Sequence, residues 1–232
     1  MSLHYAGDPL WNLAVIPPGF SMQPNAALIL VDVQPDFMPG GALACHEGHA
    51  IVPGIDRLLR GGLFRHSVAT QDWHPRGHVS FASMHAGCRP FQQIERYAHP
   101  QTLWPDHCVQ GTPGAALHPD IDWSPVDLIL RKGKRLDVDS YSAFRENHGP
   151  DGQRPSTGLA GWLRARGVSE VYAVGLARDV CVLWTVQDAL AAGFRAHMVW
   201  DLTRPVTPES DEATRATLDR LGVGIVDSAA LH

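Results

Sequence analysis

The amino-acid sequence predicts a three-layer α/β/α domain, in which helices cover both faces of a mostly parallel six-stranded sheet. Runs of consecutive apolar residues, such as 26–33 and 171–176, are typical of strands buried on both faces. These runs alternate with segments whose apolar residues recur every three or four positions, the spacing of a helix packed on a sheet. The length of 232 residues suits one such domain with a sizeable core.

The first half of the chain begins with the apolar run 26–33, which carries one acidic residue, Asp32, near its end. A carboxylate in a buried strand is costly unless it is paired, so Asp32 requires a partner. Apolar spacing over 51–59 predicts a helix, which ends before two glycines, and 67–70 predicts a short strand.

The second half repeats the alternation of strand and helix. Strands are expected at 126–130, 171–176, 196–200 and 223–226, and helices at 159–163, 180–191 and 207–221. Gly193 suits the end of the second of these helices. Thr207 is expected to cap the third, with Pro208 in its first position.

Two long segments interrupt this alternation. Residues 75–122 are rich in glycine, proline, histidine and aromatic residues, and 136–156 are polar with several glycines and prolines. Connections of this length are uncommon in compact domains and usually carry function.

Composition excludes several classes of partner. The formal net charge of −5 and the lack of a basic cluster argue against nucleic acid and anionic membranes. No apolar run is long enough to span a membrane. Four irregularly spaced cysteines without a secretion signal predict reduced thiols and a cytoplasmic protein.

The N-terminal segment differs in character from the rest of the chain. Residues 1–25 contain Pro17, Pro18 and Pro24 and lack a basic stretch followed by an apolar one. They predict an extended arm on a single domain that covers 26–232. The arm could form a contact in a homo-oligomer or cover an apolar patch, and the second is slightly favoured.

Four reactive side chains follow predicted strands. Asp32, Asp72, Lys132 and Cys181 all lie at or just beyond a strand end. In parallel sheets, ligands bind beyond the carboxyl ends of the strands. One site could therefore collect all four residues.

Cys181 lies in the first turn of a helix that follows a buried strand directly. The free N–H groups and the dipole of such a turn favour a thiolate and could hold an oxyanion. The alternative is a buried structural cysteine, since free cysteine behaves as a small hydrophobic residue. The stretch by itself supports both interpretations about equally.

A nucleophilic cysteine needs a base that removes its proton and a group that stabilises the negative charge that develops during attack. Asp32 could take the thiol proton and later pass it to a leaving amine, although a structural capping carboxylate is equally consistent with its position. Lys132 could hold the carboxylate and the developing charge, against the alternative of a solvated surface lysine.

A metal site is the second hypothesis. Asp72 and His74 are two residues apart and share one side of an extended segment, His78 follows a tight turn, and His107 comes later. One carboxylate with three imidazoles suits a divalent ion such as Zn²⁺, Mn²⁺ or Fe²⁺. Thirteen histidines occur along the chain, so chance grouping is a serious alternative.

Taken together, these motifs resemble the nicotinamidase/pyrazinamidase branch of the isochorismatase-like hydrolases. The resemblance covers residues 27–226 in the family's order, and the metal motifs separate this branch from metal-free relatives. The similar segments are Asp-Val-Gln-Pro-Asp-Phe at 32–37, Gly-Gly-Ala-Leu at 40–43, Thr-Gln-Asp-Trp-His-Pro at 70–75 with His78, Trp-Pro-Asp-His-Cys at 104–108, Lys-Gly at 132–133, Asp-Ser-Tyr-Ser-Ala-Phe at 139–144 and Gly-Leu-Ala-Arg-Asp-Val-Cys-Val at 175–182.

The resemblance implies a Rossmann-like fold and an amidase that converts nicotinamide to nicotinate and ammonia in NAD salvage, with pyrazinamide as a second substrate. It implies a triad of Asp32, Lys132 and Cys181. The N–H groups of Ala177 and Cys181 would form the oxyanion hole, with a cis peptide bond before Ala177.

It also implies one divalent ion, zinc before manganese or iron, and an aromatic substrate pocket. The metal ligands implied are Asp72, His74, His78 and His107, and the pocket residues are Phe37, Trp104 and Tyr141. The small-molecule partner implied is the amide itself, whose ring nitrogen approaches the metal.

Two rival functions stay open. An amidase for another small amide or carbamoyl compound would use the same triad, although metal-free relatives have no use for four metal ligands. A non-catalytic metal-binding scaffold would have to treat the triad as an accident. Arg178 and Val180 depart from the family pattern in the nucleophile turn, and the bulk and charge of Arg178 leave the substrate preference open.

Overall fold

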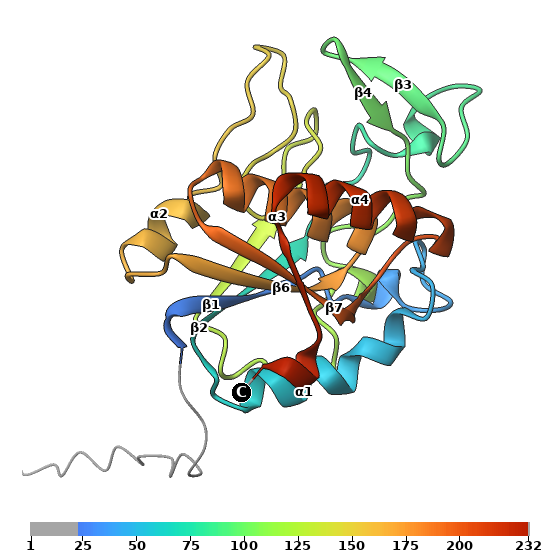
Figure 1. Cartoon of the computed structure of the whole chain (residues 1–232). Helices are drawn as coiled ribbons and strands as arrows, with labels where there is room; N and C mark the ends of the chain where they lie inside the picture. The colour runs from blue at the N-terminus through green and yellow to red at the C-terminus, as the bar shows by residue number, and fades with distance from the viewer. Residues whose placement is uncertain (1–22, 232) are drawn as a thin grey trace, which may run out of the picture.

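The computed structural model describes residues 23–231 and shows the predicted α/β/α architecture (Figure 1). The predicted arm lies outside the described residues, apart from 23–25, which begin the first strand. The six strands of the main sheet are all parallel, in the order β5-β2-β1-β6-β7-β8. Their bounds are β1 Gln23–Val31, β2 Phe64–Asp72, β5 Leu128–Lys132, β6 Glu170–Leu176, β7 Arg195–Arg204 and β8 Gly224–Val226.

Helices cover both faces of this sheet. Helix α1 (Val52–Arg60) lies on one face, and α2 (Leu159–Arg164), α3 (Leu183–Ala191) and α4 (Asp211–Leu221) lie on the other (Figure 1). Because side chains alternate along a strand, β1 supplies Leu28 and Leu30 to the first core and Ile29 and Val31 to the second. All four are buried, which explains the continuous apolar run.

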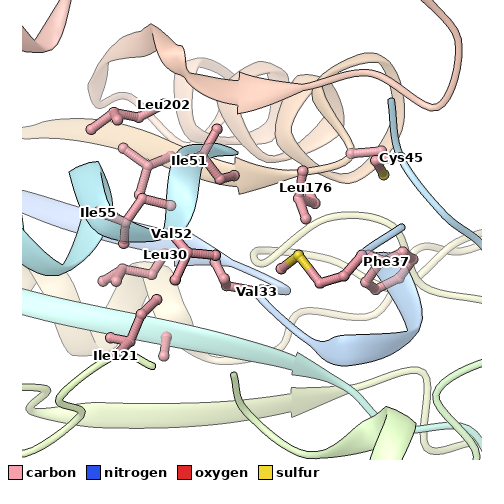
Figure 2. Close-up of a cluster of buried hydrophobic side chains, with 14 of the residues drawn as sticks. Leu30, Val33, Phe37, Cys45, Ile51, Val52, Ile55, Ile121, Leu176 and Leu202 are labelled. Carbon is pink, nitrogen blue, oxygen red and sulfur yellow. The ribbon is translucent and has the colours of Figure 1, made fainter. Parts of the chain in front are cut away.

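The core on the α1 face reaches the carboxyl ends of the strands. Figure 2 shows Leu30 with Val52 and Ile55 of α1, and further along the same cluster Phe37, which also lines the site described below. Burial of a large aliphatic side chain contributes about 1.5–3 kcal/mol to folding. This core therefore supports the floor of the site.

Several predicted boundaries were wrong. Strand β1 ends at Val31 because the backbone of Asp32 turns into the left-handed region, with φ 47°. Thr207 makes no side-chain capping bond; Pro208–Ser210 form a short 3-10 turn, and α4 begins only at Asp211. Cys181 lies in a π-helical turn, Arg178–Val182, which precedes α3.

The long segment 75–122 contains a hairpin that the sequence did not predict. Strands β3 (Gln93–Arg96) and β4 (His99–Thr102) pair antiparallel and stand apart from the main sheet (Figure 1). Their turn residues, Tyr97 and Ala98, both have positive φ without being glycine, so the usual turn signal is missing. No helix among residues 23–231 is long and apolar enough to cross a membrane.

Candidate active site

The four reactive residues that follow strands meet at one edge of the sheet, as predicted. Asp32 follows β1, and Cys181 follows β6, which pairs with β1 up to Val31 and Gly175. Asp72 and Lys132 end β2 and β5 and are direct cross-strand partners. Parallel pairing thus brings side chains that are distant in sequence to one place.

Lys132 lies at the centre of this group and is completely buried. Its Nζ lies 2.9 Å from Oδ2 of Asp32 and 3.0 Å from Oδ1 of Asp72, and it also donates to the Ser140 carbonyl at 3.0 Å. The Cys181 Sγ is 3.7 Å away. Burial by itself lowers the pKa of Lys132, but the two carboxylates outweigh it and raise that pKa well above its usual value. Lys132 is therefore a fixed buried cation, not a surface lysine.

Asp32 is held by two hydrogen bonds with one threonine. Its backbone N–H donates to Thr70 Oγ1 at 3.1 Å, and that hydroxyl donates to Asp32 Oδ1 at 2.7 Å. The other oxygen, Oδ2, forms an ion pair with Lys132 Nζ at 2.9 Å and has no further hydrogen-bond partner among the described residues. Burial raises the pKa of Asp32 in spite of Lys132. A buried carboxyl with a raised pKa suits a general base.

The expectation of a resting thiolate at Cys181 was wrong. Burial raises the pKa of the Cys181 thiol well above its usual value, and nearby Asp32 adds to this shift, while Lys132 opposes it. This shift favours the protonated thiol over the thiolate. A base that removes its proton during the reaction is thus required, and Asp32 borders the same lysine.

The turn before Cys181 has the backbone geometry that the resemblance implies. The peptide bond between Leu176 and Ala177 is cis. The carbonyl of Ala177 accepts the N–H groups of Val180 and Val182, which closes the π turn around the nucleophile.

Three of the four predicted metal ligands converge. The Nδ1 atoms of His74 and His107 lie 3.1 and 2.8 Å from the carbonyl oxygens of Gly133 and Pro105, so each Nδ1 carries the hydrogen. In a neutral ring Nε2 is then a lone-pair donor to metal. Both Nε2 atoms face Asp72 Oδ2, at 2.9 and 3.3 Å. Two imidazole nitrogens and a carboxylate oxygen that face one another form a donor set suited to a divalent cation.

The charges around this group support the same conclusion. Burial lowers the pKa of His74, but the Asp72 carboxylate outweighs it, and the net shift is upward. Burial raises the pKa of Asp72, and His74 and Lys132 together lower it well below its usual value. The space beside Asp72 Oδ2 thus favours positive charge, and two imidazoles with a carboxylate fit a divalent metal.

His78 has different neighbours from those predicted. Its Nδ1 is 2.7 Å from Ser80 Oγ and its Nε2 is 3.1 Å from the Val138 carbonyl. It belongs to a second group of ligand atoms, with His74 and Asp139. His74 is common to both groups. Sequence reasoning gave Asp139 no ligand role, because a lone aspartate in a polar loop carries no such signal.

An aromatic cavity lies beside Cys181, lined by the three predicted residues Phe37, Trp104 and Tyr141. The rings of Trp104 and Tyr141 are perpendicular, and Trp104 Nε1 donates to the Tyr141 hydroxyl at 3.2 Å. Phe37 stands edge-on to His107, with ring centroids 5.6 Å apart. The cavity joins the thiol to the metal-ligand group, and flat apolar walls of this kind accept a planar ring.

The two departures in the nucleophile turn have different outcomes. Val180 lines the cavity, whereas Arg178 points away from it, toward β7 and α4. The expectation that the bulk and charge of Arg178 lie beside the site was therefore wrong.

Gln34 is a site residue to which the sequence analysis assigned no role. Its side chain continues the sheet beyond the end of β1: Oε1 accepts the Asp72 N–H at 2.7 Å, and Nε2 donates to the Asp72 carbonyl at 2.9 Å. Nε2 also donates to the Ala115 carbonyl at 2.9 Å. A polar residue directly after a buried strand was the available signal.

Comparison with known proteins agrees with this geometry. Residues 26–230 match the isochorismatase domain. A nicotinamidase of Acinetobacter baylyi is 49% identical over 182 residues, which cover 78% of this chain and 82% of that protein.

Two solved structures extend the comparison. A nicotinamidase/pyrazinamidase of Acinetobacter baumanii has a TM-score of 0.85 and 43% identity, covering 91% of this chain and all of that chain. A pyrazinamidase of Pyrococcus horikoshii in complex with zinc has a TM-score of 0.69 and 35% identity, covering 88% of this chain and 99% of that chain.

Proposed function

This chain belongs to the isochorismatase-domain family, and on that premise we propose that it is a nicotinamidase, which hydrolyses nicotinamide to nicotinate and ammonia and so serves NAD salvage. The observation that carries the proposal is one cavity that joins a buried Asp32–Lys132–Cys181 group to the Asp72–His74–His107 group. The first group suits acyl transfer, and the second suits a ligand with a metal-binding nitrogen, such as a pyridine.

In the first half-reaction, Asp32 takes the proton of the Cys181 thiol, and Sγ forms a bond to the amide carbon. The carbonyl π pair moves to oxygen, and the N–H groups of Ala177 and Cys181 donate hydrogen bonds to the resulting oxyanion. Each such donor contributes about 3 kcal/mol to the transition state. The C–N bond then breaks, and Asp32 passes its proton to the departing nitrogen, which leaves as ammonia.

In the second half-reaction, water attacks the thioester. Asp32 takes a proton from the water, whose oxygen bonds to the acyl carbon. The C–S bond breaks, the proton on Asp32 returns to the Cys181 sulfur, and the product acid releases its remaining proton to solvent and leaves as nicotinate. The thiol is regenerated, so one base serves both steps.

Lys132 gives these steps their electrostatic balance. Its Nζ contacts Asp32 and Asp72 and lies 3.7 Å from Sγ, so it stabilises negative charge on the sulfur as the proton moves to Asp32. Because Lys132 is buried and held by three oxygens, this stabilisation needs little reorganisation.

Asp72, His74 and His107 would hold the metal, with His78 as a further ligand from the neighbouring group. We propose zinc before manganese or iron, since two imidazoles and a carboxylate suit all three ions. When bound, the metal supplies a Lewis acid that anchors the pyridine nitrogen. Phe37, Trp104 and Tyr141 would enclose the ring.

The test is ammonia release from a panel of small amides that includes nicotinamide and pyrazinamide, before and after chelation. We expect release from nicotinamide that falls on chelation and returns with zinc. Cys181→Ala should fold and be inactive, whereas Cys88→Ala, which removes a partly exposed cysteine, should keep full activity. If only a different amide is hydrolysed, the protein is the rival amidase for that compound. If no amide in the panel releases ammonia, the non-catalytic metal-binding scaffold is favoured.

A further inference from the structure

The nucleophile turn is tied to the strand and loop that follow it by two adjacent side chains, Arg178 and Asp179. Arg178 is 4% exposed although it carries a guanidinium group. Asp179 Oδ1 accepts the backbone N–H of Val206, a residue that lines the cavity. Both side chains come from the segment between Ala177 and Cys181, which provides the proposed oxyanion donors.

All three guanidinium nitrogens of Arg178 have acceptors outside the turn. Nε donates to Thr203 Oγ1 at 2.8 Å, and Nη2 donates to the carbonyls of Trp200 and Thr203 at 3.0 and 2.7 Å. Nη1 reaches both oxygens of Asp211, at the start of α4, at 2.7 Å each. The guanidinium plane also stacks on the Trp200 ring, 3.8 Å from its centroid.

These acceptors are available because β7 is irregular at this point. Its pairing with β6 shifts between Ala173, opposite Met198, and Gly175, opposite Thr203. A bulge turns carbonyl groups out of the regular ladder. The guanidinium fork of Arg178 binds two of them, Trp200 O and Thr203 O, and so joins the bulge to the turn.

We propose that Arg178 is a positioning residue that holds the N–H groups of Ala177 and Cys181 in register with the developing oxyanion. The proposal rests on the proposed amidase function and deepens it. A planar fork with acceptors on every nitrogen fixes direction as well as distance, which a lysine ammonium cannot do. Since a displacement of about 1 Å costs up to about 100-fold in rate, this rigidity acts on the chemical step.

The experiment compares Arg178→Met and Arg178→Lys with a matched control, Arg215→Met. Arg215 also stacks on the Trp200 ring, 3.6 Å from its centroid, and within residues 23–231 no hydrogen bond joins its side chain to the nucleophile turn. The Arg215→Met variant therefore removes one cation from the Trp200 ring and keeps all the hydrogen bonds of Arg178.

Two ligands separate positioning from folding. Pyridine-3-carbaldehyde accepts the Cys181 sulfur at its carbonyl carbon; the S–C bond forms, the π pair moves to oxygen, and the thiol proton passes to Asp32. The adduct needs the oxyanion donors. Nicotinate keeps a planar carboxylate, forms no adduct with Cys181 and therefore places no tetrahedral oxyanion at the N–H donors. Its affinity reports whether the pocket is intact.

We expect Arg178→Met to lower kcat by about 10- to 100-fold and to weaken aldehyde binding in parallel. KM and nicotinate affinity should stay within about twofold, since neither the bound amide nor nicotinate carries the tetrahedral oxyanion. Arg178→Lys should be intermediate, and Arg215→Met should match the wild type. An unchanged kcat, or equal losses for aldehyde and nicotinate, would overturn the proposal.

The design also covers failure to fold and failure of the assigned substrate. If Arg178→Met does not fold, Arg178→Lys and Asp211→Asn give the same comparison, because each weakens the contacts of Arg178 and keeps a hydrogen-bonding group at the substituted position. If the wild type ignores nicotinamide but hydrolyses another amide, the proposed substrate fails, and the kcat comparison is made on that amide with its own aldehyde and acid.

Discussion

Lys132 Nζ and Asp72 Oδ1 are 3.0 Å apart, and the other oxygen of the same carboxylate faces the ring nitrogens of His74 and His107. One buried carboxylate thus links the cation beside the nucleophile to the metal-ligand group. A change of charge in the metal-ligand group therefore alters the electrostatic potential at Lys132 and Cys181, and the reverse also holds, because little solvent separates the two groups.

Removal of the central cation should damage both folding and activity. Lys132→Met leaves Asp32 and Asp72 buried without their shared partner, so we expect a loss of about 3–5 kcal/mol in the free energy of unfolding. Turnover should fall by at least about 100-fold. Urea unfolding and ammonia release measure the two effects.

Lys134→Met is the matched control for this variant, because Lys134 is exposed and two residues away. It should retain wild-type stability and rate. The double variant Asp32→Asn/Lys132→Met should recover part of the stability and none of the activity. A stable, active Lys132→Met protein would refute the role assigned to this cation.

The hydroxyl group of Thr70, rather than the volume of its side chain, should determine how Asp32 is oriented as a base. Thr70→Val removes both hydrogen bonds to Asp32, so we expect a loss of about 1–3 kcal/mol in stability and about tenfold in kcat. Thr70→Ser keeps the hydroxyl and should retain most of the activity. Equal rates for the two variants would show that the hydroxyl does not orient Asp32.

Metal content tests the convergent ligands directly. After dialysis against zinc, the wild type should retain about one ion per chain, whereas Asp72→Ala and His107→Ala should bind it at least about 100-fold more weakly. Elemental analysis gives the stoichiometry. His148→Ala is the control, because this imidazole stacks on His99 outside the ligand groups. Undiminished zinc in His107→Ala would exclude it as a ligand.

The opposite end of the sheet predicts a pH-dependent contribution to stability. Partial burial raises the pKa of Glu170, but hydrogen bonds from Arg195 and His197, at 2.8 and 2.6 Å, outweigh it and lower the pKa below 4.5. A depressed carboxyl pKa stabilises the fold above the unfolded pKa, and this contribution disappears as the pH falls through the folded pKa.

Glu170→Gln should therefore cost about 1–2 kcal/mol near neutral pH and progressively less as the pH falls below about 4.5. Urea unfolding across that range measures the difference from the wild type. Glu95→Gln removes an exposed carboxylate of the hairpin and should show no such trend. A difference that stays constant with pH would contradict the linkage.

The sequence alone was enough to predict the succession of main-sheet strands and helices along the chain, and the residues that follow each strand. Apolar runs such as that of β1 are determined by burial on both faces, and a parallel sheet then places Asp32, Asp72, Lys132 and Cys181 at one edge. The sequence could therefore predict these site residues before any contact was known.

The tertiary structure decided which atoms these side chains meet. Arg178 turns to the bulge of β7, His78 lies with Asp139, and burial keeps Cys181 as a thiol. None of these outcomes follows from local spacing, because each depends on carbonyls, carboxylates or desolvation supplied by segments distant in sequence. Patterning along the chain determined where chemistry could occur, and three-dimensional packing determined the charge and direction of each group that performs it.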